Sequence, residues 1–280
     1  MLSDGEASDL AMPYKGCPGS FAVAQHDMMG QIYGGTMSFD RLRYELRLMG
    51  RRVLLTPVLL MLGFALFAVL LAYLKVAPAR FLSGGLEMIV PIATGAVVGT
   101  IIMHDPALEL QLTLPRRYTR TSLLRLVLIT ACATAIALLS TLITSALHQV
   151  YLFQPQHGWG EPAQFFVQSL AWFATLLWCV GLGFCLSLLL RSRSAAGALL
   201  AGIWIAEIPF KDYIFLSDWL RPFSLFPTTL VYPPTVVPQQ YINLWFTNRI
   251  EVLATGAALV IIGWLLLHNT EGLLKGMNEE

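Results

Sequence analysis

The stretch FFVQSLAWFATLLWCVGLGFCLSLLL, residues 165–190, contains no Asp, Glu, Lys or Arg. A transmembrane helix needs about 20 mainly apolar residues to cross a hydrocarbon core about 30 Å thick. Residues 165–190 meet that requirement, whereas buried helices of soluble domains rarely contain so long an uncharged run. The fold class therefore depends on how many similar runs the rest of the chain contains.

Five further runs come near the length of a membrane span. The second run in the chain is short and holds Pro91, Gly95 and Gly99, with Gly85 directly before it, which predicts a kink or close packing with a neighbouring helix. The fifth run ends at Glu207 and Pro209, so it can be either a tilted span or a broken one. The six predicted spans are Val53–Tyr73, Leu86–Met103, Leu123–Leu147, Phe165–Leu190, Ala195–Phe210 and Ile250–Leu267.

The composition agrees with a polytopic membrane protein of the all-α class. Of the 280 residues, 56% are hydrophobic and 12% are charged, against about 25% charged in an average soluble domain. The net charge of +1 gives no reason to expect nucleic acid as a partner. Three of the four cysteines lie inside apolar runs, without the spacing of a metal site or of a disulfide framework. We therefore expect no metal site.

Lys and Arg are distributed unevenly between the two sides of the predicted spans. With the N terminus placed in the cytoplasm, twelve lie in or beside inner segments and five in outer segments, leaving Lys15 aside. Short cytoplasmic loops collect Lys and Arg because cations translocate poorly. We therefore expect a multi-pass protein of the cell membrane with both termini in the cytoplasm.

Two segments precede the first predicted span. Residues 1–36 are polar and rich in glycine, which is consistent with a mobile tail or an extended start. Residues 38–52 have apolar and basic side chains on different faces of a helix. They form either an amphipathic connecting helix in the inner headgroup layer or a cytoplasmic extension of the first span. The residues that define this pattern are Phe39, Leu42 and Leu46 on one side and Arg41, Arg43 and Arg47 on the others. Residues 37–280 then form one six-span domain.

A long segment, residues 211–249, separates the fifth and sixth predicted spans on the outer side. Its five prolines exclude a continuous spanning helix. Its aromatic side chains are of the kind that settle at a membrane interface, and they include Trp219, Phe223, Phe226, Tyr232, Tyr241 and Trp245. We expect short helices and turns that cap the outer mouth of the bundle.

The segment HDPALELQLTLPRR, residues 104–117, lies on the cytoplasmic side between spans two and three. Asp105 can cap a helix that starts at Pro106, and Glu109 adds a favourable negative charge near its N terminus. Pro115 ends this helix, because a residue before proline is pushed out of the helical region. Leu108 and Leu112 share one face, which either fits a groove on a second protein or dips into lipid. A basic turn with Arg116 and Arg117 follows Leu114 and Pro115.

The phrase ELQLTLPRRYTRTSLLRLVLI, residues 109–129, resembles the segment after the second span in the membrane subunits of ABC exporters of the second type. That family comprises drug, antibiotic, lipid and polysaccharide exporter permeases. Its members have an acidic residue, a "leu-x-x-leu-pro" phrase, a basic or hydroxyl turn and then the next span. The matching residues are Glu109, Leu112, Leu114, Pro115, Arg116 and Arg117. Over residues 38–280 the order of segments also agrees, although the N-terminal tail and the short fifth run depart from the family pattern.

The resemblance implies that residues 104–117 form a coupling helix that docks on a cytoplasmic ATPase subunit, with the connecting helix nearby. The residues in contact with the ATPase would be Asp105, Pro106, Leu108, Glu109, Leu112, Leu114, Pro115, Arg116 and Arg117. Two permease subunits, identical or different, would line the substrate path within the lipid bilayer. ATP and Mg²⁺ would bind to the partner ATPase, so this chain would carry no cofactor.

The sequence contains no G-x-x-x-x-G-K-[ST] phosphate loop, no H-E-x-x-H and no G-x-S-x-G. We therefore expect a transport subunit and not an enzyme, since an intramembrane enzyme would need clustered His, Asp or Ser. Glu87 and Glu207 lie near the outer ends of spans, where they can reach interfacial water and contact a substrate. A secondary transporter and a non-transporting membrane anchor or assembly subunit stay open as alternatives.

Overall fold

The structure is a computed structural model that describes residues 50–75, 79–103, 115–146, 160–190, 192–230 and 239–268. All of them belong to one compact unit that begins at Arg47. Every regular element in these ranges is a helix. The predicted tail, residues 1–36, lies outside the described residues. So does most of the predicted connecting helix, because only residues 50–52 are described and they open the first long helix.

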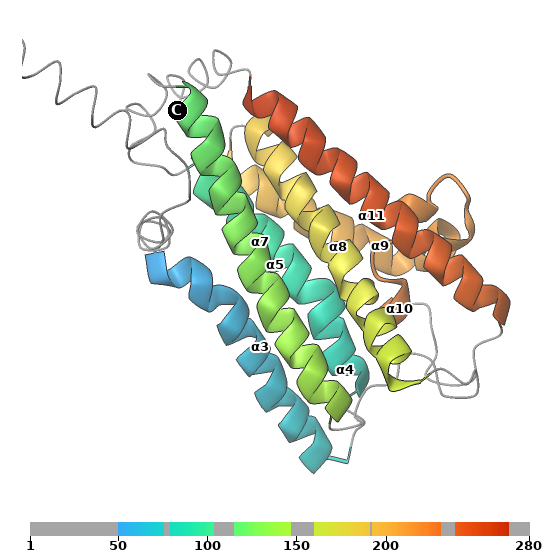
Figure 1. The fold of residues 1–280 in the computed structure, drawn as a ribbon. Helices are drawn as coiled ribbons and strands as arrows, with labels where there is room; N and C mark the ends of the chain where they lie inside the picture. The colour runs from blue at the N-terminus through green and yellow to red at the C-terminus, as the bar shows by residue number, and fades with distance from the viewer. Residues whose placement is uncertain are drawn as a thin grey trace, which may run out of the picture. The chain divides into compact units, whose positions relative to one another are not determined.

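The elements follow one another without strands in the described ranges (Figure 1). The long helices are α3 (Gly50–Tyr73), α7 (Pro115–Ala146), α8 (Glu161–Leu190), α9 (Arg193–Leu216) and α11 (Gln239–Leu267). One composite helical path consists of α4 (Ala79–Gly84), the π-helix η1 (Gly85–Ile89) and α5 (Val90–Met103). Two short helices, η3 (Arg221–Phe223) and α10 (Pro227–Leu230), lie between α9 and α11.

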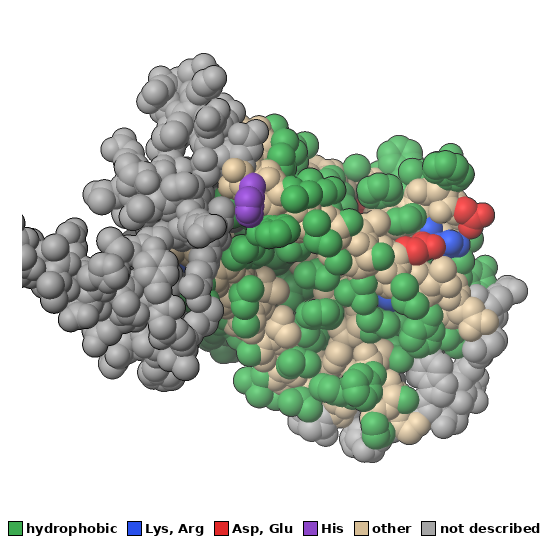
Figure 2. Space-filling model, turned by 45° about the horizontal axis from the view of Figure 1, so that its top comes forward, with side chains coloured by type: hydrophobic (Ala, Val, Ile, Leu, Met, Phe, Trp, Pro, Cys, Tyr) green, Lys and Arg blue, Asp and Glu red, His purple; other side chains and the backbone are tan. Residues whose placement is uncertain are grey.

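Five of these helical segments are long and apolar enough to cross a membrane. They are Leu55–Tyr73, Phe81–Thr100, Thr121–Ser145, Pro162–Leu190 and Tyr241–Leu267. By length and composition the chain is therefore a multi-pass membrane protein, and its described surface is largely apolar (Figure 2). The structure does not confirm a sixth span. The predicted run Ala195–Phe210 lies in the 24-residue helix α9, which also carries Glu207, Lys211 and Asp212.

Helix α8 lies at the centre of the bundle, where it packs against α5 on one side and α11 on the other (Figure 1). Glycines make both contacts close. A Cβ atom added to Gly183 would lie 2.3 Å from the carbonyl oxygen of Gly95 in α5. A Cβ atom added to Gly181 would lie 2.8 Å from the carbonyl oxygen of Gly256 in α11. Without these glycines the helix backbones could not approach so closely.

The second predicted run has both the irregularity and the close packing that its proline and glycines predict. Pro91 has no N–H to donate to the carbonyl of Glu87, one turn earlier. Immediately before it the chain forms the wider π turn η1, in which the Val90 N–H donates to the Gly85 carbonyl. Glu87 therefore lies in this π turn, between the regular helices α4 and α5.

The predicted break between the last two spans is shorter than the sequence indicated. Helix α9 continues to Leu216 and α11 already begins at Gln239, so both boundaries of the predicted loop, residues 211–249, were wrong. Residues 217–230, which we call the broken segment, contain the short helices and turns that were predicted. Ser217 and Ser224 have extended backbones that interrupt the helices.

The predicted coupling helix, residues 104–117, is described only at its end. Residues 104–114 lie outside the described residues. Pro115 is the first residue of α7, a position where its fixed φ and missing N–H cost nothing. Arg116 and Arg117 therefore belong to the first turn of α7, and the separate basic turn expected after Pro115 was wrong.

Candidate functional site: a buried charge cluster

Three charged side chains from three helices are buried together. Glu87 in η1 and Glu207 in α9 are each 2% exposed, and Arg249 in α11 is 0% exposed. The prediction that both carboxylates reach interfacial water was therefore wrong. The assignment of Arg249 to an outer loop was also wrong, because α11 begins well before the predicted start of the last span at Ile250.

Glu207 holds the middle of the broken segment. Its Oε1 atom accepts hydrogen bonds from the backbone N–H of Leu225, at 2.6 Å, and of Phe226, at 3.0 Å. These two N–H groups lie between η3 and α10, where no helix supplies an acceptor, and a buried N–H needs a partner. The other oxygen of Glu207 is buried and has no hydrogen-bond partner among the described residues.

Glu87 holds the next turn of the broken segment. Its carboxylate accepts the backbone N–H of Thr228, at 3.2 Å, and that of Thr229, at 2.8 Å. The hydroxyl of Thr229 also donates to it. Glu87 thus satisfies N–H groups at the start of α10, which a capping residue of the same helix would otherwise satisfy.

Arg249 pairs with one of the two carboxylates, that of Glu87, and ties the segment to α8. Its guanidinium donates to the carbonyl oxygens of Leu225, at 3.1 Å, and Ala171, at 2.9 Å, and to the Thr175 hydroxyl, at 3.0 Å. It also lies 3.5 Å from Glu87 Oε1. The desolvation of each buried ion costs several kcal/mol, so buried ions need contacts of this number and geometry.

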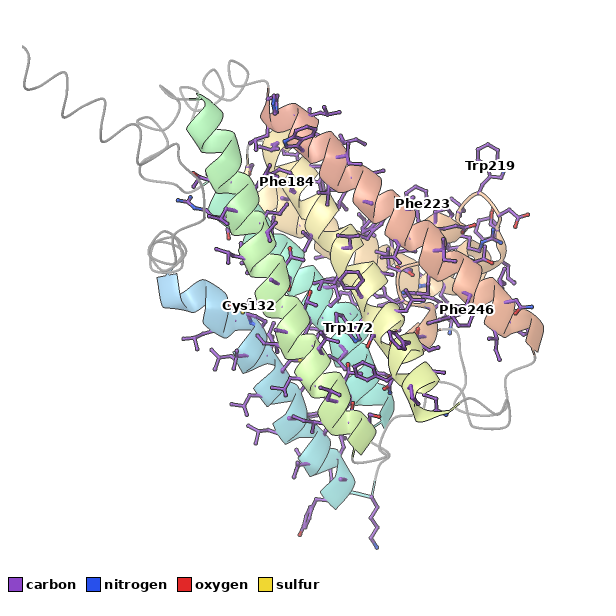
Figure 3. All side chains as sticks on the ribbon, in the orientation of Figure 1. Cys132, Trp172, Phe184, Trp219, Phe223 and Phe246 are labelled. Atoms are coloured by element: carbon purple, nitrogen blue, oxygen red, sulfur yellow. The ribbon has the colours of Figure 1, made fainter. Side chains whose placement is uncertain are left out.

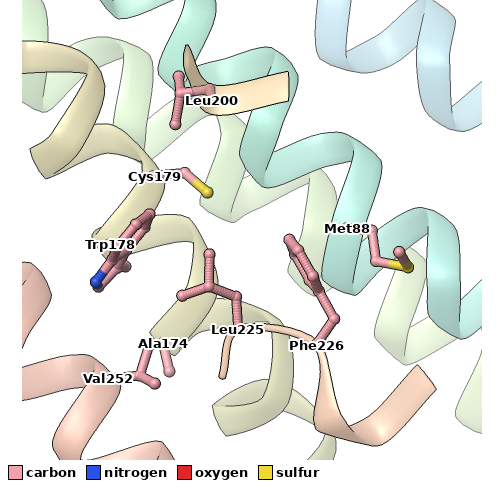
Figure 4. Close-up of a cluster of buried hydrophobic side chains, with 8 residues drawn as sticks. All are labelled: Met88, Ala174, Trp178, Cys179, Leu200, Leu225, Phe226 and Val252. Carbon is pink, nitrogen blue, oxygen red and sulfur yellow. The ribbon is translucent and has the colours of Figure 1, made fainter. Parts of the chain in front are cut away.

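The apolar side chains of the broken segment complete its attachment. Leu225 and Phe226 point into a core cluster with Met88, Trp178, Cys179 and Leu200 (Figure 4). Phe226 and Trp245 are both fully buried, so their predicted place at the membrane interface was wrong. Trp219 and Phe223 do lie on the surface, and Trp219 projects away from the bundle (Figure 3).

A second charged group lies nearer the surface. Arg221 donates to Glu251 in α11 through two nitrogens, at 2.8 and 2.9 Å, and to Asp218 at 3.0 Å. The hydrogen bond with Glu251 raises the pKa of the Arg221 guanidinium, so Arg221 stays charged at any physiological pH. Asn248 of α11 donates to the carbonyls of Arg221 and Ser224 and fixes the same turn.

A small cavity adjoins the cluster. It has a volume of about 20 Å³ and is lined by Ser83, Leu86, Glu87, Thr141, Thr144, Gln168, Ala171, Trp172 and Thr228. Polar side chains are among its lining residues, but most of the surface that faces it is apolar. Glu87 and Thr228 therefore join the broken segment on one side to this cavity on the other.

The geometry of the cluster indicates a role in fixing the backbone of the broken segment. In the part of the chain that the structure describes, no three His, Cys, Asp or Glu side chains are grouped to hold a metal ion. The cluster instead fixes an irregular backbone within a helical bundle. The residues predicted to contact an ATPase lie outside the described residues or, for 115–117, at the start of α7.

Comparison with family models, with curated proteins and with solved structures finds no match for this chain.

Proposed function

We propose that this chain is the membrane-spanning subunit of an ATP-driven exporter of the second ABC type. The observation that carries the proposal is the phrase ELQLTLPRR, residues 109–117, directly after the second apolar segment. Further support comes from the segment order, with an irregular stretch between α9 and a final apolar helix. In this reading α9 is the fifth of six spans and both termini are cytoplasmic.

The chain would work as a dimer with a separate ATPase. The sequence has no phosphate loop, so ATP and Mg²⁺ bind to the partner. Residues 104–114 form a short helix held in a groove of that partner, and the first turn of α7 transmits its movement to the bundle.

Charge reversal at the coupling residues tests this proposal. Co-expressed with a cognate ABC ATPase subunit, the wild-type chain should co-purify with the ATPase, and reconstituted complexes should move labelled substrate only with ATP. Glu109→Lys or Arg116→Glu should abolish co-purification, because each places a like charge against a complementary surface. Leu108→Ala and Leu112→Ala should reduce substrate-stimulated ATP hydrolysis, because each removes an apolar contact with the groove.

The matched control is Asp218→Lys, which reverses an exposed charge in the broken segment, on the opposite side of the membrane in the proposed orientation. It should leave co-purification unchanged. A purified complex whose ATP hydrolysis is unaffected by Leu108→Ala and Leu112→Ala would contradict the coupling role.

Secondary transport is the second candidate, and the buried cluster favours it. Ion-driven transporters place ionisable residues beside interrupted helices inside the bundle, and Glu87, Glu207 and Arg249 surround such an interruption. The same experiment separates the two candidates. Substrate movement by the chain alone, driven by a proton or sodium gradient without ATP, would establish secondary transport.

A further inference from the structure

We infer that Glu207 is a proton-binding site inside the folded bundle, and that its side chain is a neutral carboxylic acid at neutral pH. The ligand of this site is the proton itself. The inference goes beyond the proposed function. It requires neither an ATPase partner nor a particular orientation in the membrane, so the two can fail independently.

The buried cluster contains more acidic groups than basic ones. Glu87 and Glu207 are both 2% exposed, and Arg249 is the cation buried with them. Its guanidinium lies 3.5 Å from Glu87 Oε1, so its charge is paired with that carboxylate. With both acids ionised, the cluster would hold one negative charge in excess. A buried charge without a partner is strongly unfavourable, and the group takes its neutral form instead.

The hydrogen bonds indicate which of the two acids takes the proton. Both oxygens of Glu87 accept hydrogen bonds from residues of α10, which suits an ionised carboxylate. In Glu207, by contrast, both N–H donors of the broken segment bond to Oε1. Oε2 is buried and has no hydrogen-bond partner among the described residues. A proton on Oε2 removes the charge and leaves both N–H bonds to Oε1 intact.

The elements packed against α9 bring little further positive charge to Glu207. Helix α5 contains no Asp, Glu, Lys or Arg. Arg221 of η3 is already paired with Glu251, and Lys211 and Asp212, one turn further along α9, carry opposite charges. The charged and titratable groups around Glu207 are therefore Glu87 of η1, Cys179 of α8, Arg221 of η3, Arg249 of α11 and, on α9 itself, Lys211 and Asp212.

Infrared spectroscopy detects the proton directly. A protonated carboxyl group has a C=O stretching band that an ionised one lacks. Exposed Asp and Glu side chains are ionised at neutral pH, because their pKa is about 4. The full chain, purified in a detergent without carbonyl groups, should therefore show an acid band at neutral pH. Glu207→Gln should abolish this band.

Further variants assign the band to one residue. Glu207→Asp should shift its frequency, because a protonated aspartic acid absorbs at a different frequency, whereas Glu87→Asp should leave it in place. Glu87→Gln should abolish the band, since Glu207 is then the one acid beside Arg249 and can ionise. The matched control is Glu251→Gln, which removes a carboxylate that keeps 27% of its side-chain surface exposed. It should leave the band unchanged.

The bound proton also makes stability depend on pH. An unfolded glutamate releases its proton above a pH of about 4.3, whereas Glu207 keeps it in the folded chain. The folded state then binds one proton more than the unfolded state. Between that pH and neutrality the unfolding equilibrium constant should rise about tenfold per pH unit on this account. Glu207→Gln should lose this contribution, and Glu251→Gln should retain it.

The proton site is overturned if the wild-type chain has no acid band at neutral pH, or if the band keeps its frequency in Glu207→Asp. It is also overturned if the wild-type chain and Glu207→Gln lose stability equally as the pH rises. Should Glu207→Gln fail to fold, the wild-type spectrum and the two aspartate variants decide the outcome.

Discussion

Replacement of Arg249 by methionine is expected to lower the free energy of unfolding by about 3–5 kcal/mol, the cost of leaving buried charges without their partner. Arg249 is fully buried and lies 3.5 Å from Glu87. Without it, two carboxylates stay in the interior with no cation beside them, and the Leu225 carbonyl loses two guanidinium hydrogen bonds. Denaturant unfolding of the purified chain in detergent, followed by its helical circular dichroism, measures the change.

Arg221→Met is the matched control for this prediction. Arg221 also pairs with a glutamate of α11, but its partner Glu251 keeps 27% of its side-chain surface exposed to solvent. Pairs that water can reach contribute about 0–1 kcal/mol, so this variant should lose far less stability. The double variant Arg249→Met with Glu87→Gln should recover part of the loss, because it also removes a stranded charge. Equal losses for the two arginine variants would contradict the role of Arg249.

The apolar runs could be predicted from the sequence because span length and charge are local properties. Five of the six predicted spans correspond to helices that can cross a membrane. The fifth run was harder to assign, since the helix that contains it, α9, also carries Glu207 and further charges towards Leu216. The end of α9 at Leu216 could not be placed from hydropathy alone.

The charge cluster could not be predicted in the same way, because its members meet only through the packing of helices distant in sequence. Glu87 and Arg249 looked like residues at the ends of spans, next to water. One local signal was available: QQYINLWFTNR, residues 239–249, contains no proline and can extend the last helix backwards. That extension would have placed Arg249 inside a helix and made its need for a buried partner apparent.

The aromatic residues of the predicted outer segment, residues 211–249, show the same limit. Trp219 and Trp245 were both predicted at the interface, yet the first is 90% exposed and the second is 0% exposed. Trp245 donates its ring N–H to the Thr228 hydroxyl and lies with its ring 5.6 Å from the Arg249 guanidinium carbon. Sequence indicates that such a ring needs a partly polar environment, which the interior of this bundle also provides.

The proposed coupling helix remains a prediction from residues 104–114, which lie outside the described residues. Its C-terminal limit is the part that the structure tests. Pro115 was predicted to end this helix, whereas in the structure it begins α7 and leaves no separate basic turn. Arg116 and Arg117 are therefore residues of the first turn of α7.

Substitution of Gly183 by alanine should destabilise the chain by about 1–3 kcal/mol, the usual cost of overpacking a tight contact. The added Cβ atom would lie 2.3 Å from the Gly95 carbonyl oxygen, so α5 and α8 must separate. A backbone carbonyl cannot rotate away as a side chain can. The same denaturant titration measures the loss, and Gly95→Ala should show a similar one, since its Cβ atom would lie 2.5 Å from the Cys179 carbonyl oxygen.

Gly202→Ala in α9 is a control that should raise the free energy of unfolding instead of lowering it. Nothing lies within 4 Å of a Cβ atom added at this position, so only the gain in helix propensity remains, up to about 1 kcal/mol. Gly183→Ala and Gly202→Ala make the same chemical change in two helices of one bundle and differ only in what faces them. If both variants raised stability, the close approach of α5 and α8 at Gly95 would be wrong, and with it the packing that brings Glu87 to the broken segment.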